Sequence, residues 1–146
     1  MRTTWTSATV PDIYLVDTAV FAYALGLPHE RRDACRRIVG LAAEGEVELH
    51  ASVEMVQGLL HHRMRRTQRE AAVRQARAAG DLCVLHPFDA AVLARALELV
   101  SSTSLRGRDA VHAATAAVNG IARLLSSDPD FDGVPGLVRV DPGDLG

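Results

Sequence analysis

The sequence contains no lysine and only two cysteines, and each shortage excludes a class of chemistry. All 16 basic residues are arginine, so any mechanism that needs a lysine amine is excluded. Cys35 and Cys83 form neither a Cys-x-x-Cys pair nor a dense disulfide framework, and we expect reduced thiols. There is no Gly-x-x-x-x-Gly-Lys loop, which excludes a P-loop. The six histidines show no His-Glu-x-x-His or Cys/His spacing, which argues against a zinc site.

Long apolar runs are also missing, so we expect no membrane-spanning segment. Residues 1–12 are polar and lack the apolar core of a signal peptide, and we therefore expect a cytoplasmic protein. The formal net charge of −2 argues against a protein that coats nucleic acid by charge alone. The length of 146 residues predicts one domain, over residues 12–146, preceded by a flexible N-terminal extension over residues 1–11.

Short apolar runs alternate with helical patterns along the rest of the chain. Strands are predicted at 13–16, 47–51, 82–85, 122–127 and 138–140. Helices are predicted at 18–25, from Pro28 to Glu44, after the N-cap Ser52, over the basic stretch 63–77 closed by Gly80, after the N-cap Asp89, and at 108–119. The apolar stripe of the helix after Ser52 is predicted to contain Val53, Val56, Leu59 and Leu60. This alternation predicts an α/β fold, a three-layer α/β/α sandwich around a central parallel sheet.

Four acidic residues lie where such a fold places its ligands. Asp17 and Asp128 each follow an apolar strand, and Glu54 and Asp109 each lie in the first turn of a helix. Taken singly, each has a structural explanation: a helix cap, a turn residue before Pro129, or a favourable charge near a helix N-terminus. Because ligands of open α/β sheets bind outside the carboxyl ends of the strands, all four could converge at one edge.

Converging carboxylates repel one another unless cations neutralise them. Carboxylate and water oxygens suit Mg²⁺ or Mn²⁺. Two such ions about 3.5–4 Å apart form the clamp used for phosphodiester hydrolysis, in which one activates the attacking water and the other stabilises the leaving oxygen. The pattern thus favours an enzyme that needs several acids and no nucleophilic side chain, with either one or two ions.

The segments around these acids resemble the four motifs of PIN-domain nucleases, in the family's order and over nearly the whole chain after Pro11. The first is 13–23, which includes Asp17, and the second is 52–56, which includes Glu54. The third is 108–116, which includes Asp109, and the fourth is 125–137, which begins Leu-Ser-Ser-Asp-Pro-Asp. The size and the closing segment are most similar to the VapC-type toxins of toxin–antitoxin pairs.

This resemblance implies a Mg²⁺- or Mn²⁺-dependent endoribonuclease that forms a homodimer and is blocked by a small antitoxin. It assigns Asp17, Glu54 and Asp109 to the metal, with Asp128 as the fourth acid and Asp130 as the alternative. Thr18 and Ser127 are expected to orient a carboxylate or a metal-bound water.

Basic residues near the acids are the candidates for binding a substrate phosphate. Arg106 and Arg108 flank Asp109, although Asp109 could instead simply pair with one of them. The basic patch formed by 61–66 with Arg69, Arg74 and Arg77 could bind RNA phosphates or be an ordinary solvated helix face.

Two other functions stay open at this level. One is a PIN-like fold that binds RNA or protein without cleaving. The other is an aspartyl-phosphate enzyme with Asp17 as nucleophile, although receiver domains need a lysine and dehalogenase-like phosphatases need a second Asp where this chain has Ala19.

Overall fold

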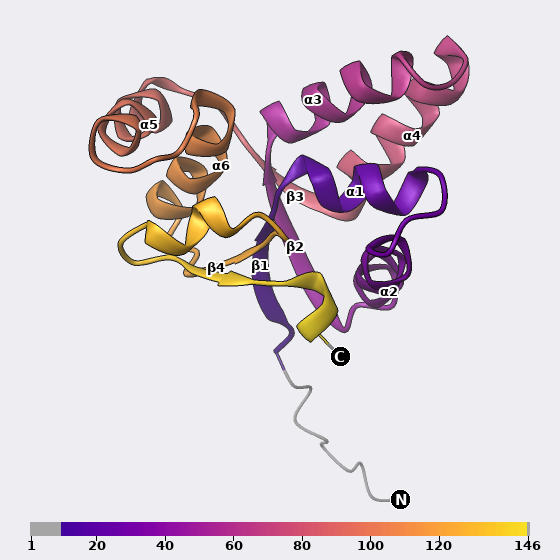
Figure 1. Cartoon of the computed structure of the whole chain (residues 1–146), viewed down its shortest axis with the longest axis horizontal. Coiled ribbons are helices and arrows are strands. Elements are labelled where there is room, and N and C mark those ends of the chain that lie inside the picture. Colours follow the sequence, from indigo (N-terminus) through magenta and orange to yellow (C-terminus); the bar gives the residue numbers. More distant parts are fainter. Residues whose placement is uncertain (1–9, 146) are drawn as a thin grey trace, which may run out of the picture.

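A computed structural model describes residues 10–145, and the molecule is built around a parallel sheet with helices on both faces (Figure 1). The strands are β1 (Asp12–Val16), β2 (Val47–Ser52), β3 (Cys83–His86), β4 (Arg123–Leu125) and β5 (Val138–Val140). The helices are α1 (Thr18–Leu25), α2 (Arg32–Ala43), α3 (Val53–Met64), α4 (Arg69–Leu82), α5 (Ala90–Ser102) and α6 (Gly107–Val118), with 3-10 turns η1 (Pro129–Gly133) and η2 (Pro142–Asp144). The predicted three-layer α/β/α fold is confirmed.

The sheet order is β3-β2-β1-β4-β5, and every neighbouring pair is parallel. The chain winds outward from β1 to β3 on one side and then returns to form β4 and β5 on the other. The order therefore reverses between β1 and β4, and the carboxyl edge at such a switch point is where open α/β sheets bind ligands.

Successive side chains of each central strand belong to two separate apolar cores, one on each face of the sheet. Tyr14 and Val16 of β1 pack with α1, α2, α3 and α4, whereas Leu15 between them packs with α5 and α6. Leu124 and Leu125 of β4 divide in the same way. Because successive side chains point to opposite faces of a strand, an uninterrupted apolar run is what a strand buried on both faces requires.

Helix α6 packs closely because its buried face consists of small side chains. Ala110, Ala113, Ala114 and Ala116 are almost completely buried against the sheet and α5. The helix predicted at 108–119 is confirmed as Gly107–Val118, and its close packing brings the first turn of α6 to the edge of the sheet.

Several predicted boundaries were wrong. The second helix begins at Arg32 instead of Pro28, because residues 29–31 form a turn in which His29 accepts hydrogen bonds from the backbone of Arg31 and Arg32. The basic stretch 63–77 is two helices, since Arg66 and Thr67 donate back to the Arg63 carbonyl and so end α3 in a turn.

Three further expectations also need correction. Helix α4 continues past Gly80 to Leu82. Strand β4 ends at Leu125 and not at residue 127. Helix α3 buries Met55, Gly58 and Leu59, while Val53 is 41% exposed because its position falls outside the face that meets the sheet.

Strand β1 begins at Asp12, and the predicted domain boundary at this residue stays a prediction. Most of the predicted flexible extension, residues 1–9, lies outside the described residues, so that part stays a prediction. Within residues 10–145, no helix is both long and apolar enough to cross a membrane.

Candidate metal and phosphodiester site

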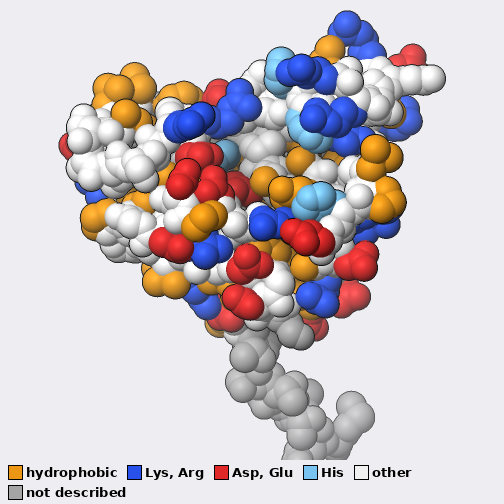
Figure 2. Space-filling view, viewed as in Figure 1, with side chains coloured by type: hydrophobic (Ala, Val, Ile, Leu, Met, Phe, Trp, Pro, Cys, Tyr) orange, Lys and Arg blue, Asp and Glu red, His pale blue; other side chains and the backbone are white. Residues whose placement is uncertain are grey.

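A pocket of about 440 Å³ lies at the carboxyl ends of β1 and β4, at the switch point of the sheet. It contains three of the four predicted acids. Its lining consists of Asp17, Thr18, Ala19, Tyr23, Arg31, Arg108, Asp109, His112, Ser127, Asp128 and Pro129. Figure 2 shows acidic side chains gathered in the middle of this face of the molecule.

Asp17 is both the cap of α1 and a wall of the pocket. Its backbone amide donates to the carbonyl of Leu125 at 3.4 Å, which ties the end of β1 to the end of β4. Its Oδ1 accepts from the amide of Val20 at 3.3 Å. The residue is only 5% exposed, and burial raises the pKa of its carboxyl to about 6 in spite of a hydrogen bond from Ser126. The helix-cap explanation is therefore correct without being sufficient, because a cap does not need to be buried.

Asp109 reaches the same pocket from the opposite helical layer, in the first turn of α6. Burial raises its pKa, and the negative charges of Asp128 and Asp130 raise it further, whereas Arg108 and Arg106 act in the opposite direction. Among residues 10–145, no ion pair joins Asp109 to either arginine. The pairing considered from the sequence is thus not formed.

Asp128 enters from the loop between β4 and η1. Its amide donates to Oγ of Ser126 at 3.0 Å, and its Oδ1 accepts from the amide of Asp130 at 2.9 Å. Asp130 is exposed and does not line the pocket, but its effect on the pKa of Asp109 places its charge nearby. The structure thus leaves Asp128 inside the pocket and Asp130 at its margin.

Glu54 is the predicted acid that does not line this pocket. It lies half-buried in the first turn of α3, where its amide donates to Oγ of the N-cap Ser52 at 3.1 Å. Across the described part of the chain, no three Asp, Glu, His or Cys side chains are grouped closely enough to hold a metal ion. The fold brings Asp17, Asp109 and Asp128 to one pocket and leaves Glu54 on the neighbouring helix.

Of the predicted supporting and phosphate-binding residues, some line the pocket and one does not. Thr18, Ser127 and Arg108 line the pocket, whereas Arg106 does not, although its charge acts on Asp109. Oγ1 of Thr18 is buried without a hydrogen-bond partner among the described residues.

Two polar residues of the site were not among the predicted site residues. Ser126 is fully buried and joins two acids, because its side chain hydrogen-bonds Asp17 and accepts from the amide of Asp128. His112 is 1% exposed, its Nδ1 has no partner among the described residues, and burial lowers its pKa to about 4. The available signal for Ser126 was its place directly after β4, and for His112 its place one turn after Asp109.

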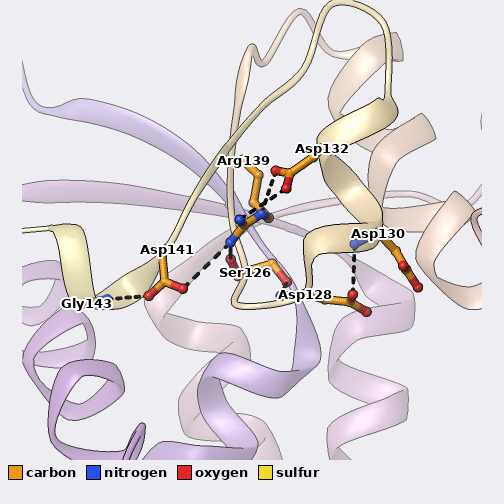
Figure 3. Close-up of polar contacts among 7 residues, drawn as sticks. All are labelled: Ser126, Asp128, Asp130, Asp132, Arg139, Asp141 and Gly143. Atoms are coloured by element: carbon orange, nitrogen blue, oxygen red, sulfur yellow. Dashed lines mark hydrogen bonds and ion pairs between the residues drawn. The ribbon is translucent and has the colours of Figure 1, made fainter.

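The loop that contains Asp128 is held in place by one arginine (Figure 3). Arg139 of β5 donates to both carboxylate oxygens of Asp132, at 2.7 and 3.3 Å, and to the carbonyl of Ser126 at 3.2 Å. A further ion pair at 3.6 Å joins it to Asp141. Within residues 10–145, no ion pair joins Asp128 to Arg139, and Asp128 lines the pocket.

The chain is similar to proteins of one family over most of its length. A family profile described as the PIN domain matches residues 14–137. A curated relative, ribonuclease VapC7 of Mycobacterium tuberculosis, is 35% identical over 135 residues, which cover 90% of this chain and 93% of the relative.

Two solved structures show the same fold. The crystal structure of VapC20 of Mycobacterium tuberculosis, described as a sarcin–ricin loop cleaving toxin, has a TM-score of 0.72 at 22% identity and covers 88% of this chain and 98% of that one. The structure of VapBC2 from Rickettsia felis bound to a promoter DNA fragment has a TM-score of 0.70 at 17% identity, with coverage of 88% and 98%.

Proposed function

The chain belongs to the PIN-domain family, and from that premise we propose that it is a divalent-metal-dependent endoribonuclease toxin that a small antitoxin neutralises. The observation that supports this most directly is the pocket at the switch point of the sheet, where Asp17, Asp109 and Asp128 arrive from three separate segments. Phosphodiester hydrolysis by metal ions needs such a group of acids and no nucleophilic side chain.

The donor chemistry of the pocket residues suits Mg²⁺ or Mn²⁺, although the described acids have to move closer together to hold an ion. Their donor set is carboxylate and hydroxyl oxygen, which hard cations prefer. The hydroxyl of Thr18 has no hydrogen-bond partner among residues 10–145. The pKa values of the Asp17 and Asp109 carboxyls are raised, and a bound cation would lower them. We assign the metal to Asp17, Asp109 and Asp128, with Glu54 contributing from α3 and Asp130 as the alternative fourth acid. Bound there, the ion would activate the attacking water and stabilise the leaving oxygen.

The protein's own residues position the substrate and these acids. Arg108 at the rim of the pocket is placed to hold a phosphate, since arginine binds phosphate oxygens through two donors and stays charged. Arg106 adds positive charge beside it. Ser126 contacts both the Asp17 carboxylate and the Asp128 backbone, and Ser127 also lines the pocket.

An apolar groove on the α1–α4 side supports the antitoxin as partner. It has a volume of about 330 Å³ and is lined by Phe21, Ala24, Leu25, Arg36, Val39, Arg74, Gln75, Ala78, Ala79 and Leu82. Apolar walls with two arginines suit a peptide of apolar and acidic side chains. One similar structure, from Klebsiella pneumoniae, is described as a toxin–antitoxin complex. Ala78→Glu should abolish antitoxin binding in a titration while RNA cleavage persists.

The exposed face of α5 supports a homodimer. Leu93, Leu97 and Val100 are one turn apart and 46%, 60% and 44% exposed, so the described part of the chain leaves this apolar row uncovered. We also propose that the protein acts in the cytoplasm.

The experiment that tests the enzyme is RNA cleavage by the purified chain. Cleavage should require Mg²⁺ or Mn²⁺ and should stop with EDTA. In Asp17→Asn the cleavage rate should fall by more than about 100-fold, which is more than the loss caused by replacing a residue that only hydrogen-bonds a metal ligand. RNA binding without any cleavage in the wild-type chain would instead favour the non-catalytic alternative.

A further inference from the structure

A second groove, of about 470 Å³, continues from the acidic pocket toward the carboxyl end of α3. The two share Thr18, Ala19, Tyr23 and Arg108 in their linings. The far part of the second groove is lined by His61, His62, Arg65 and Arg66, and its floor includes Ala22 and Gly58. Figure 2 shows arginine and histidine side chains bordering the acids toward the α3–α4 end of the molecule.

Gly58 of α3 lies at the junction between the two grooves. A Cβ at this position would lie 3.4 Å from Oγ1 of Thr18 and 3.6 Å from Nη1 of Arg108. Arg108 therefore lies over the bare backbone of α3, with its guanidinium at the boundary between the acidic and the basic part. The two parts form one path lined first by acids and then by arginines.

The basic part has positive charge that the protein itself does not neutralise. None of its lining residues is acidic. Arg65 has no side-chain hydrogen bond or ion pair within residues 10–145, and Arg66 has only a bond of 3.2 Å to the carbonyl of His62. Burial, and then the charges of Arg66, Arg63 and Arg65, lower the pKa of His62, as a positive potential would.

On the basis of the proposed function, we propose that single-stranded RNA runs from the acidic pocket over Gly58 into this groove, where Arg65 and Arg66 bind phosphates on one side of the scissile bond. The acidic pocket alone repels a polyanion, so attraction has to come from charges beside it. An acidic peptide along the same path would meet the carboxylates at its end, whereas a phosphodiester chain brings there the group that the site is built to cleave.

The test measures RNA binding as a function of salt, with Asp17→Asn as a non-cleaving background. The variant is Arg65→Gln with Arg66→Gln. The matched control is Arg69→Gln with Arg77→Gln, which removes the same charge from exposed positions of α4 outside the groove. The probe is a fluorescein-labelled single-stranded RNA of about 12 nucleotides, within the range that single-strand sites cover.

Each lost phosphate contact should reduce the slope of log K against log salt by about 0.7. The groove variant should therefore lose about 1.4 in slope and bind about 25-fold more weakly at about 0.1 M salt, with the difference vanishing near 1 M. The control should match the background chain. In the cleaving chain, the groove variant should raise KM and leave kcat nearly unchanged.

Equal slopes for the groove variant and the control, in a chain that still cleaves RNA, would overturn the path and leave the proposed function standing. A chain that neither binds nor cleaves RNA would remove both. Unchanged RNA affinity with loss of affinity for a hexaglutamate peptide would assign the groove to a protein partner and also overturn the proposal.

Discussion

Replacing Asp17 by Asn should make the metal-free protein more stable. The Asp17 carboxyl has a pKa of about 6 in the folded chain, against an ordinary value of 3.8. The folded state therefore holds this proton more tightly than the unfolded state does. The difference of roughly 2.2 pKa units corresponds to about 3 kcal/mol. The free energy of unfolding should fall by that amount as pH rises from about 4 to about 6, and should be lowered throughout above pH 6.

Asparagine removes the charge and keeps the cap, because Asn and Asp are about equally good N-caps. At pH 7 in EDTA, Asp17→Asn should raise the free energy of unfolding by up to about 3 kcal/mol, or Tm by roughly 6–12 °C. Chemical denaturation across this pH range measures it, as the difference between the variant and the wild type. That difference should be near zero at about pH 4 and should grow toward pH 7.

Asp89→Asn is the matched control. Asp89 caps α5 with the same geometry, its Oδ1 accepting from the amide of Val92 at 3.1 Å, but it is exposed. Its replacement should leave the stability almost unchanged, because Asn is about as good an N-cap as Asp. A lower Tm for Asp17→Asn, or a gain that does not vary with pH, would refute the reasoning from burial. Mg²⁺ should stabilise the wild type by about 1.4 kcal/mol at ten times its Kd and should stabilise Asp17→Asn less.

Three more outcomes are expected. Asp128→Asn should reduce RNA cleavage far more than Asp130→Asn, because only Asp128 lines the pocket; equal losses in single-turnover assays would contradict this. Arg139→Gln should lower Tm by a few degrees and reduce cleavage, as thermal melts and rates can show, since its bonds hold the loop of the fourth motif. Leu97→Glu should convert a dimer to a monomer in light scattering, whereas Leu27→Glu, exposed on the opposite side of the sheet, should not.

Much of the fold could be predicted from the sequence because the signals are local. The apolar run at 13–16 has no polar interruption, and a strand buried on both faces needs that pattern. Ser52 and Asp89 begin helices because their side-chain oxygens accept hydrogen bonds from free amides of the first turn. The alanines of α6 indicate close packing before any partner is known.

The helix boundaries that were predicted wrongly depend on interactions that the periodicity of apolar residues does not indicate. The turn after α3 forms because backbone amides of residues 66 and 67 return to Arg63, although the basic pattern continues through it. Gly80 could end a helix, but in α4 it instead lies against the side chain of Val56. These outcomes were decided by which hydrogen bonds and contacts the packed chain allows.

By itself, the sequence determined which acids lie at the ends of strands and the beginnings of helices, because strand and helix patterns depend on residues that are close together in the sequence. Only the tertiary structure decided that β4 lies beside β1, so that Asp128 and the buried Ser126 meet Asp17 while Glu54 stays outside the pocket lining. It also decided that Arg139 is occupied by Asp132 and Asp141. Strand order, burial and the raised pKa of Asp17 depend on contacts between segments more than 100 residues apart, and those distances exist only once the chain has packed.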